Sequence, residues 1–460
     1  MRSKLMNKYT RLFSLSLLSS ALLAPAAHAA VSAEEAKRLG QDLTPVGAER
    51  AGNADGSIPA WTGGLPKDAG TILPNGTPSD PFASEQPLFT INASNYEQHR
   101  GLLTDGQVAL LKRYPETYVL PVYETHRSVG FSAEVAEEAA RNATEAQLIN
   151  DGNGLAGFRG SVAFPIPQSG LEVIWNHITR FNTGSSISIT DTAAPQPNGD
   201  YVITTTEQHY TPVDQTTDYE PADSDDVLFY YSHKITAPAR QVGEVVLVHE
   251  TVDQIANPRR TWMYTAGQRR VRRAPSINYD ATGATTAGLR TADSRDMYNG
   301  APDRYEWKLV GKKELLIPYN SYRLASPDLT YKEMIQPGHL AMNHTRYERH
   351  RVWEVVAELK DGQRHVYKTR RFYIDEDSWS IAEVDHYDTR DQLWRVGERH
   401  SFYHYAQQAP LSAADVFHDL QNGRYIALSM ANEQRDGYRF DYRASTSDYS
   451  PGALRSSGVR

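Results

Sequence analysis

The sequence predicts a mostly β, α+β fold: one large curved antiparallel sheet, a half-barrel, with a few helices packed on its concave face. From about residue 185 to 405, apolar and polar side chains alternate with a period of two, which is typical of strands with one buried face. These segments end at turn residues and few helical stretches separate them, so neighbouring strands are expected to pair antiparallel. The 27 tyrosines, 12 phenylalanines and 7 tryptophans also favour strands.

The first 29 residues are predicted to be an export signal. Four basic residues surround the start of an apolar stretch at Leu12–Leu23, which is too short for a comfortable membrane span. Ala27-His28-Ala29 has the small-x-small pattern that signal peptidase reads. We therefore expect cleavage near Ala29 and a periplasmic product.

Composition excludes several classes of function. The chain has no cysteine, which rules out disulfides, thiolate metal sites, cysteine nucleophiles and a lipid anchor on an N-terminal cysteine. Its formal net charge is −8, and it falls to −12 once the four basic residues of the signal are removed. So acidic a protein is a poor candidate for nucleic-acid binding.

Residues 30–100 are rich in Gly, Pro, Asn and Asp and are predicted to form an extended wrap. Recurring aromatic residues in this stretch would pin it to the body of the protein: Trp61, Phe82 and Phe89. The rest, residues 101–460, is predicted to form a single domain, since large β folds often stay undivided.

Helices are expected at 102–150 and at 171–181. Thr104 and Gln107 stand at capping-box spacing, and residues 132–149 are strong helix formers that stop before Gly152. Residues 171–181 carry one apolar stripe of helical spacing: Leu171, Ile174, Trp175, Ile178 and Phe181.

About ten strands fill residues 185–405, with hairpin turns at Asn198-Gly199 and Asp361-Gly362. After them we predict a helix at Ser412–Leu420, because Ser412 and Asp415 stand at cap spacing, and then a strand ending near 432. The connection at 275–303 is too long for a hairpin loop. It is either a lid or binding segment, or a floppy insertion.

No catalytic residue, metal site or cofactor is predicted. Gly152-x-Gly154-x-x-Gly157 matches the dinucleotide motif as a string, but no strand precedes it, so it is interpreted as a turn. The histidines are scattered, and the acidic turn at Asp223, Asp225 and Asp226 lacks the rest of a calcium loop. A Gly-x-Ser-x-Gly nucleophile elbow is absent, whereas a pair of carboxylates that meets only in space stays open.

The predicted binding surface is the apolar face of the sheet. Large side chains recur at alternate positions of several strands, and alternate positions share a face. If the sheet curls, the part not covered by helices lines a cavity. The predicted lining residues are Phe229, Tyr231, Trp262, Tyr264, Trp307, Leu309, Trp353 and Val355, together with Trp175.

Residues 258–274 combine an aromatic strand with a cluster of arginines. Apolar surface beside a cationic rim suits an amphiphile with one apolar and one anionic end. Arg269, Arg270, Arg272 and Arg273 are the residues expected to meet an anionic headgroup or an acidic partner protein. The alternative is an ordinary edge hairpin whose arginines pair with neighbouring carboxylates.

Four segments resemble blocks of the family catalogued as domain of unknown function 1329: LTPVGAERAGNADGSIPAWTGG (43–64), FPIPQSGLEVIWNH (164–177), RRTWMYTAGQRRVRRAP (259–275) and APDRYEWKLVGKKELLIPYNSY (301–322). The family is similar in fold to the Lol-type lipoprotein carriers of the periplasm, whose curved sheet and helical plug enclose a hydrophobic cavity. This chain is about twice as long as a simple Lol carrier, and its wrap and its 275–303 loop are candidates to fill or cover such a cavity.

The resemblance implies transport across the envelope, because family members are often encoded beside resistance-nodulation-division (RND) type exporters and an outer-membrane partner. It supplies no catalytic residues. The leading hypothesis is a soluble periplasmic carrier or chaperone for a lipid or another hydrophobic amphiphile. The alternatives are an adaptor that docks an RND-type transporter or an outer-membrane protein, and a hydrolase of envelope glycans or lipids.

Overall fold

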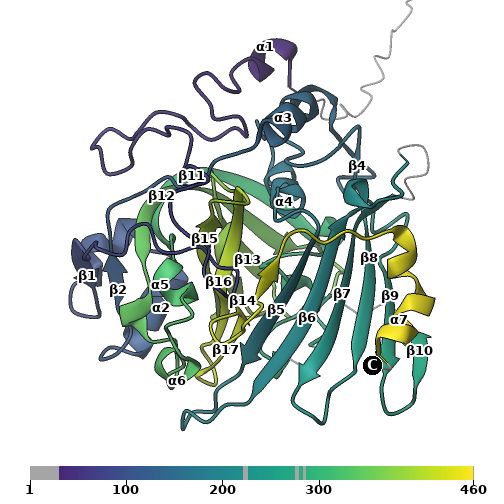
Figure 1. Cartoon of the computed structure of the whole chain (residues 1–460). Helices are drawn as coiled ribbons and strands as arrows, with labels where there is room; N and C mark the ends of the chain where they lie inside the picture. Colours follow the sequence, from purple (N-terminus) through teal and green to yellow (C-terminus); the bar gives the residue numbers. More distant parts are fainter. Residues whose placement is uncertain (1–30, 221–225, 275–278, 283–285, 459–460) are drawn as a thin grey trace, which may run out of the picture.

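A single large sheet organises the computed structural model, which describes residues 31–220, 226–274, 279–282 and 286–458 (Figure 1). The predicted export signal lies outside these residues, as do Asp223 and Asp225 of the acidic turn. In the described part of the chain, no helix is long and apolar enough to cross a membrane.

Two antiparallel meanders join edge to edge to form the sheet, and β17 pairs with β5 at the junction. The first meander contains β5 (Ser186–Ala193), β6 (Ile203–Pro212), β7 (Val227–Ala237), β8 (Val245–Thr251), β9 (Arg260–Thr265) and β10 (Arg270–Arg273). The second contains β11 (Tyr305–Pro318), β12 (Tyr347–Leu359), β13 (Thr369–Asp375), β14 (Ile381–Tyr387), β15 (Leu393–His404), β16 (Ala409–Asp419) and β17 (Arg424–Met430). The predicted fold class, a large curved antiparallel sheet with few helices, is confirmed.

Short strands extend or accompany this sheet. β1 (Phe89–Ile91) pairs with β2 (Leu120–Val122), which touches β12 at one residue pair, and β18 (Tyr438–Arg439) pairs with β5. A separate hairpin joins β3 (Gln147–Ile149) to β4 (Gly154–Ala156). A strand, β3, does precede the glycine string at 152–157, contrary to the expectation, but the string forms the turn and second strand of a hairpin and does not open a helix.

The helices are α1 (Ala33–Ala36), α2 (Asp105–Arg113), α3 (Ala133–Glu145), α4 (Gly170–Thr179), α5 (Tyr322–Ala325), α6 (Tyr331–Met334) and α7 (Pro451–Gly458). The capping box of α2 is confirmed, since Thr104 and Gln107 bond each other's backbone N–H groups at 3.0 and 3.1 Å. Residues 102–150 are only partly helical, because β2 and an extended stretch separate α2 from α3, and β3 follows α3.

The helix predicted at Ser412–Leu420 is wrong, because this segment lies in β16 between β15 and β17. Ser412 Oγ does donate to Asp415 Oδ1 at 2.9 Å, but it does so within a strand. Residues 411–419 are all buried, so both faces of the strand are apolar or packed. A strand covered on both sides loses the alternation that would have identified it.

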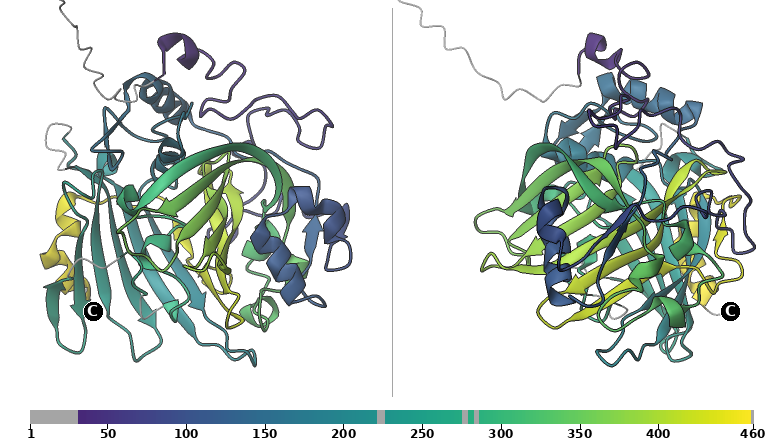
Figure 2. Two further views of the ribbon diagram at one scale, coloured as in Figure 1. Left: turned by 180° about the vertical axis from the view of Figure 1, so that it is seen from behind. Right: turned by 90° about the vertical axis from the view of Figure 1, so that its left-hand side faces the viewer.

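Helices cover both faces of the sheet (Figure 2). On the concave face, α4 packs against β11 and β12, and Val173 and Ile174 share a core with Phe372. On the convex face, α2 packs on β14 and β15, α5 on β15 and β16, and α7 on β8, β9 and β10. On the concave face, α4 therefore covers only the part of the sheet around β11 and β12.

The N-terminal wrap is tied to the body by both aromatic and charged side chains. Trp61 Nε1 donates to the Val129 carbonyl at 2.7 Å, and Phe82 stacks on His126 with ring centroids 4.1 Å apart. Phe89 stacks on His99 and stays 40% exposed, so it holds β1 rather than a core.

Candidate functional site

The concave face divides into a sealed half and an open half. Directly opposed residues of neighbouring strands share a face, so the register of the sheet defines each row of side chains. In the second meander, one such row runs through Val355, Phe372, Val384, Gly397, Phe417 and Ile426. These residues belong to one buried core together with α4, so this half is sealed.

The open half lies on the first meander. Two rows of opposed residues cross it: Tyr210, Tyr231, Val248 and Thr261, and Gln208, His233, Val246, Met263 and Arg272. Tyr231 is buried, but Tyr210, Val246 and Val248 are only half-buried and Met263 is 41% exposed. The described residues thus leave a mixed apolar and aromatic strip of the concave face uncovered.

Residues 286–303, which we call the plug segment, lie across both halves on the concave face. In the sealed half, Tyr298 packs edge-on against Phe372 with ring centroids 5.6 Å apart, and an added Cβ at Gly397 would lie 3.1 Å from Met297 Cε. In the open half, the guanidinium of Arg295 lies 3.7 Å above the Tyr231 ring centroid. The connection predicted to be a lid or a floppy insertion is a packed plug over its described residues.

Asp293 and Asp296 anchor the plug segment through buried ion pairs. Asp293 Oδ2 lies 2.6 Å from Arg370 Nη1 and 3.2 Å from His365 Nε2. Asp296 pairs with Arg180, which follows α4, at 2.8 Å and also with Arg399 of β15. Burial alone would raise the pKa of both carboxyls, but the facing cations outweigh it and hold each pKa below its usual range. Both aspartates are therefore ionised and paired at neutral pH.

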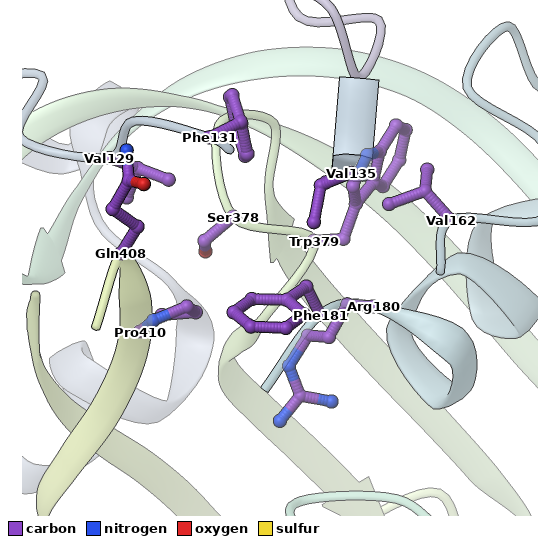
Figure 3. Close-up of a pocket in the computed structure, with 10 residues that line it drawn as sticks. All are labelled: Val129, Phe131, Val135, Val162, Arg180, Phe181, Ser378, Trp379, Gln408 and Pro410. Atoms are coloured by element: carbon purple, nitrogen blue, oxygen red, sulfur yellow. The ribbon is translucent and has the colours of Figure 1, made fainter. Parts of the chain in front are cut away.

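One void in the described part of the protein lies near Arg180, the partner of Asp296, and it is small. It lies between α3, the end of α4 and the β13–β14 and β15–β16 turns, and Figure 3 shows its lining, which includes Phe131, Val135, Phe181 and Trp379. Its volume of about 10 Å³ is roughly the space that one water molecule needs. This void is therefore too small for a lipid-sized guest.

The predicted lining residues fall into three groups. Six of them lie on the concave face: Phe229, Tyr231, Trp307, Leu309, Trp353 and Val355. Trp262 and Tyr264 lie on the convex face, where they pack beneath α7 with Leu454. Trp175 points away from the sheet into a small core with Leu155 and Phe164. The structure therefore does not bring all nine residues to one cavity.

The predicted arginine cluster also separates. Arg259 is paired with Glu250 at 2.7 Å and donates to the Asn299 carbonyl of the plug segment. Arg269, Arg270, Arg272 and Arg273 are exposed in and beside β10, the edge strand of the first meander. Within the described residues, these four side chains form no ion pair, so the predicted pairing with neighbouring carboxylates accounts for Arg259 alone.

Sequence reasoning missed the charged residues of the plug segment. The one available signal was the density of charge in RTADSRD (290–296). Their partners Arg180, Arg370 and Arg399 stand far away in the sequence, and only the folded sheet brings them together.

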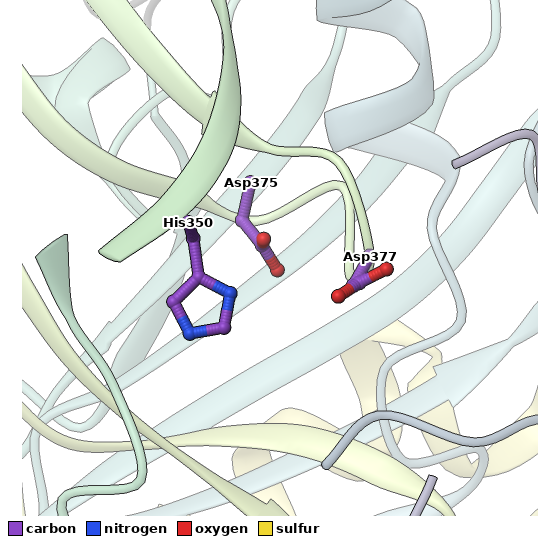
Figure 4. Close-up of side chains that lie close together, drawn as sticks. All are labelled: His350, Asp375 and Asp377. Carbon is purple, nitrogen blue, oxygen red and sulfur yellow. The ribbon is translucent and has the colours of Figure 1, made fainter. Parts of the chain in front are cut away.

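A second polar cluster lies on the convex face, where His350, Asp375 and Asp377 come together (Figure 4). Their potential ligand atoms all lie within 4.8 Å of one another, and the residue types suit a divalent cation. Arg127 already bonds Asp377 through Nε at 2.9 Å and Nη2 at 2.6 Å. The positive charge in this cluster is therefore supplied by Arg127, which also ties the N-terminal wrap to the sheet through the Glu49 carbonyl.

A pair of carboxylates stands directly opposed on the same face, Glu383 on β14 and Glu398 on β15. Burial and the charge of Glu398 raise the pKa of Glu383 well above its usual range, whereas the pKa of Glu398 is lowered by partners such as His418 that outweigh its own burial. Divergent pKa values of this kind are typical of acid–base pairs. Here, however, Thr104 and Gln107 of the α2 capping box cover Glu383, so the pair is closed to a substrate.

Comparison with known proteins places the chain in a family. The profile described as "Protein of unknown function (DUF1329)" matches residues 90–455. A Pseudomonas aeruginosa protein described as "Uncharacterized protein PA3922" is 55% identical over 444 residues, which are 96% of this chain and 98% of the relative.

Three solved structures are similar at low sequence identity. A putative outer membrane lipoprotein-sorting protein domain from Vibrio parahaemolyticus is 12% identical with a TM-score of 0.43, covering 63% of this chain and 98% of its own. A DUF1329 family protein from Desulfovibrio piger is 14% identical with a TM-score of 0.39, covering 62% and 97%. A LolA superfamily protein from Nitrosomonas europaea is 10% identical with a TM-score of 0.36, covering 62% and 98%.

Proposed function

This chain belongs to the DUF1329 family, and on that premise we propose that it is a periplasmic carrier or chaperone for a lipid or another hydrophobic amphiphile. The observation that supports this proposal most is the open half of the concave face, where the described residues leave Val246 and Val248 half-buried and Met263 exposed, opposite Arg272. An apolar strip with cationic groups at its border matches a molecule with one apolar and one anionic end.

In this mechanism the guest lies on the open half, and a larger guest displaces the plug segment. Burial of apolar surface contributes about 25 cal/mol per Å². A guest that covers a few hundred Å² is then held at roughly micromolar affinity after the costs of association. The plug segment is held by ion pairs and by Leu289, Met297 and Tyr298 in the core of the sealed half, so a larger guest would have to replace these contacts together.

Fluorescence of N-phenyl-1-naphthylamine, which brightens in apolar surroundings, tests this proposal. The probe is expected to bind the purified protein and to be displaced by decanoate. A Met263→Glu variant places a charge in the uncovered strip and should weaken binding by about tenfold or more. Val202→Glu is the control, because Val202 is exposed and lies outside the strip, and it should leave binding unchanged. Met430→Glu would not serve, because Met430 is buried.

A second candidate function is an adaptor that docks an RND-type transporter or an outer-membrane protein. The observation that favours it is the row of exposed arginines along the β10 edge: Arg269, Arg270, Arg272 and Arg273. Reversing Arg269 and Arg273 to glutamate, which keeps Arg272 opposite Met263 in place, should weaken capture of an acidic partner and leave probe binding unchanged. If the carrier and adaptor roles coexist, the two sets of variants separate them.

We propose no catalytic role. The carboxylates best placed for acid–base chemistry, Glu383 and Glu398, are buried beneath α2. A hydrolase of envelope glycans or lipids would need this cover to open. Activity lost in Glu398→Gln with folding intact would favour that alternative.

A further inference from the structure

Two arginines of the plug segment have no carboxylate partner. Around them, nearby carboxylates on the concave face pair with other arginines: Asp293 with Arg370, Asp296 with Arg180 and Arg399, Asp415 with Arg399, and Glu250 with Arg259. Arg290 and Arg295 form no ion pair with any residue of the described ranges. Two cations are therefore left over beside Tyr231 on the concave face, where the neighbouring cations are matched.

The two arginines are close enough to repel each other. The pKa of Arg290 is lowered first by burial and then by the charge of Arg295. The same two cations, after burial, hold the pKa of His233 at about 4. His233 is therefore neutral at pH 7, and its ring can donate one hydrogen bond on the concave side of β7.

The hydrogen-bonding capacity of these arginines is largely unused. Arg290 Nε is buried and has no hydrogen-bond partner. The guanidinium of Arg295 lies over the Tyr231 ring in a cation–π contact. Tyr231 OH in turn donates to Gln208 Oε1 at 2.7 Å, which fixes the ring under the guanidinium. A buried donor without an acceptor costs free energy, and an anionic oxygen group would remove that cost.

The apolar strip begins directly beside His233 and Tyr231. His233 is directly opposite Val246, which is directly opposite Met263, and Val248 is directly opposite Tyr231. A tail attached to an anion held between the two arginines would therefore lie along half-buried and exposed apolar side chains. The exposed arginines of β10 lie at the far end of the same row, since Met263 is opposite Arg272.

We propose that Arg290 and Arg295, with His233, form a binding site for a single carboxylate or phosphate group on the concave face. This inference deepens the carrier proposal by naming the headgroup class, and it rests on the carrier proposal only for the apolar tail. The guanidinium pair provides several N–H donors in fixed planes, which is the arrangement that binds carboxylate and phosphate oxygens.

Isothermal titration with four ligands tests the site: decyl phosphate, decanoate, inorganic phosphate and uncharged decanol. The wild type is expected to bind decyl phosphate and decanoate more tightly than decanol. Arg290→Gln/Arg295→Gln should weaken the two anionic amphiphiles by about tenfold or more and leave decanol unchanged. Arg270→Gln/Arg272→Gln removes the same charge from the β10 edge. It should weaken binding of the two anionic amphiphiles by less than about threefold.

The outcomes separate the headgroup site from the carrier proposal. Equal loss in both double variants would overturn the site, because only the overall field would then matter. If inorganic phosphate binds as tightly as decyl phosphate and depends on Arg290 and Arg295, the anion site stands and the carrier proposal fails. If amphiphiles bind but ignore both arginines, the carrier proposal stands and the site is wrong.

Arginine Nε–Hε signals of the wild-type protein, followed by NMR during the same titration, give a readout that needs no variant. Two of these signals are expected to shift together with decyl phosphate and to be absent from the set that shifts with decanol. An unchanged arginine spectrum at saturating decyl phosphate would contradict the site.

Discussion

Arg370 Nη1 on β13 lies 2.6 Å from Asp293 Oδ2 in the plug segment, and both side chains are buried. The pair joins a strand of the sealed half to the segment that crosses both halves of the concave face. Breaking a buried pair by removing one charge leaves the other uncompensated, which typically costs 3–5 kcal/mol.

Asp293→Asn is therefore expected to lower the free energy of unfolding by about 3–5 kcal/mol, measured by urea denaturation. Hydrogen exchange should also accelerate in residues 286–303, because the anchor of the plug segment is lost. Asp391→Asn is the matched control: Asp391 pairs with Lys368 on the surface, and its loss should cost at most about 1 kcal/mol. Equal effects of the two substitutions would contradict the anchoring role.

Arg290→Gln should behave in the opposite way. Because Arg290 has no ion pair and is repelled by Arg295, its replacement is expected to leave the free energy of unfolding within about 0.5 kcal/mol of wild type or to raise it. The comparison with Asp293→Asn uses the same denaturation experiment. A loss of several kcal/mol would reveal a partner for Arg290 that the described residues do not include.

The contact between Gly397 and Met297 couples the sheet to the plug segment. An alanine Cβ at position 397 would lie 2.8 Å from Val384 Cγ1 and 3.1 Å from Met297 Cε, so Gly397→Ala should destabilise the protein by about 1–3 kcal/mol. Met297→Ala removes one of these clashes. The double variant is therefore expected to lose less than the sum of the two single losses, by about 0.5 kcal/mol or more. Strict additivity would mean that Met297 does not touch this strand.

The contribution of Asp385 to the stability of the protein should fall as pH rises from about 4 to 7. Burial, with a contribution from Asp105, raises the pKa of Asp385 to about 7. A carboxyl whose pKa is raised in the folded state holds its proton more tightly when folded, so stability is lost as pH climbs from the unfolded to the folded pKa. For Asp385 this loss amounts to roughly 4 kcal/mol as an upper estimate.

Asp385→Asn should flatten that part of the pH profile and raise the melting temperature at pH 8 above that of wild type. Thermal unfolding between pH 4 and pH 8 is the measurement, and Asp361→Asn, in the exposed β12–β13 turn, is the control. A stability difference between wild type and Asp385→Asn that stays constant from pH 4 to pH 8 would contradict the assignment.

The sequence allowed good predictions wherever the cause of a structure is local. The capping box at Thr104 and Gln107 is confirmed because its hydrogen bonds span three residues, and the stripe that includes Ile174 does lie on α4. The antiparallel meanders follow from the period-two pattern and from short turns. The resemblance of four sequence blocks to DUF1329 is confirmed by the match over residues 90–455.

Predictions that depend on long-range register were weaker. Alternation shows that Trp262 and Tyr264 share a face, but it does not show which face, and the pairing of β9 with β8 places them beneath α7. Ser412 and Asp415 are expected from the sequence to cap a helix, but the pairing of β16 with β15 places both in a strand. The only local signal at Asp293 and Asp296 was a dense run of charge, since their partners follow α4 or lie on β13 and β15.

Native mass spectrometry of the protein released from its own cells without denaturant tests the central claim most directly, namely that the concave face holds an amphiphile beside the plug segment. The account predicts a bound mass that organic extraction removes and that carries an acidic headgroup and an apolar tail. Preparations that contain only the bare polypeptide, and that also fail to bind N-phenyl-1-naphthylamine or decyl phosphate, would contradict it.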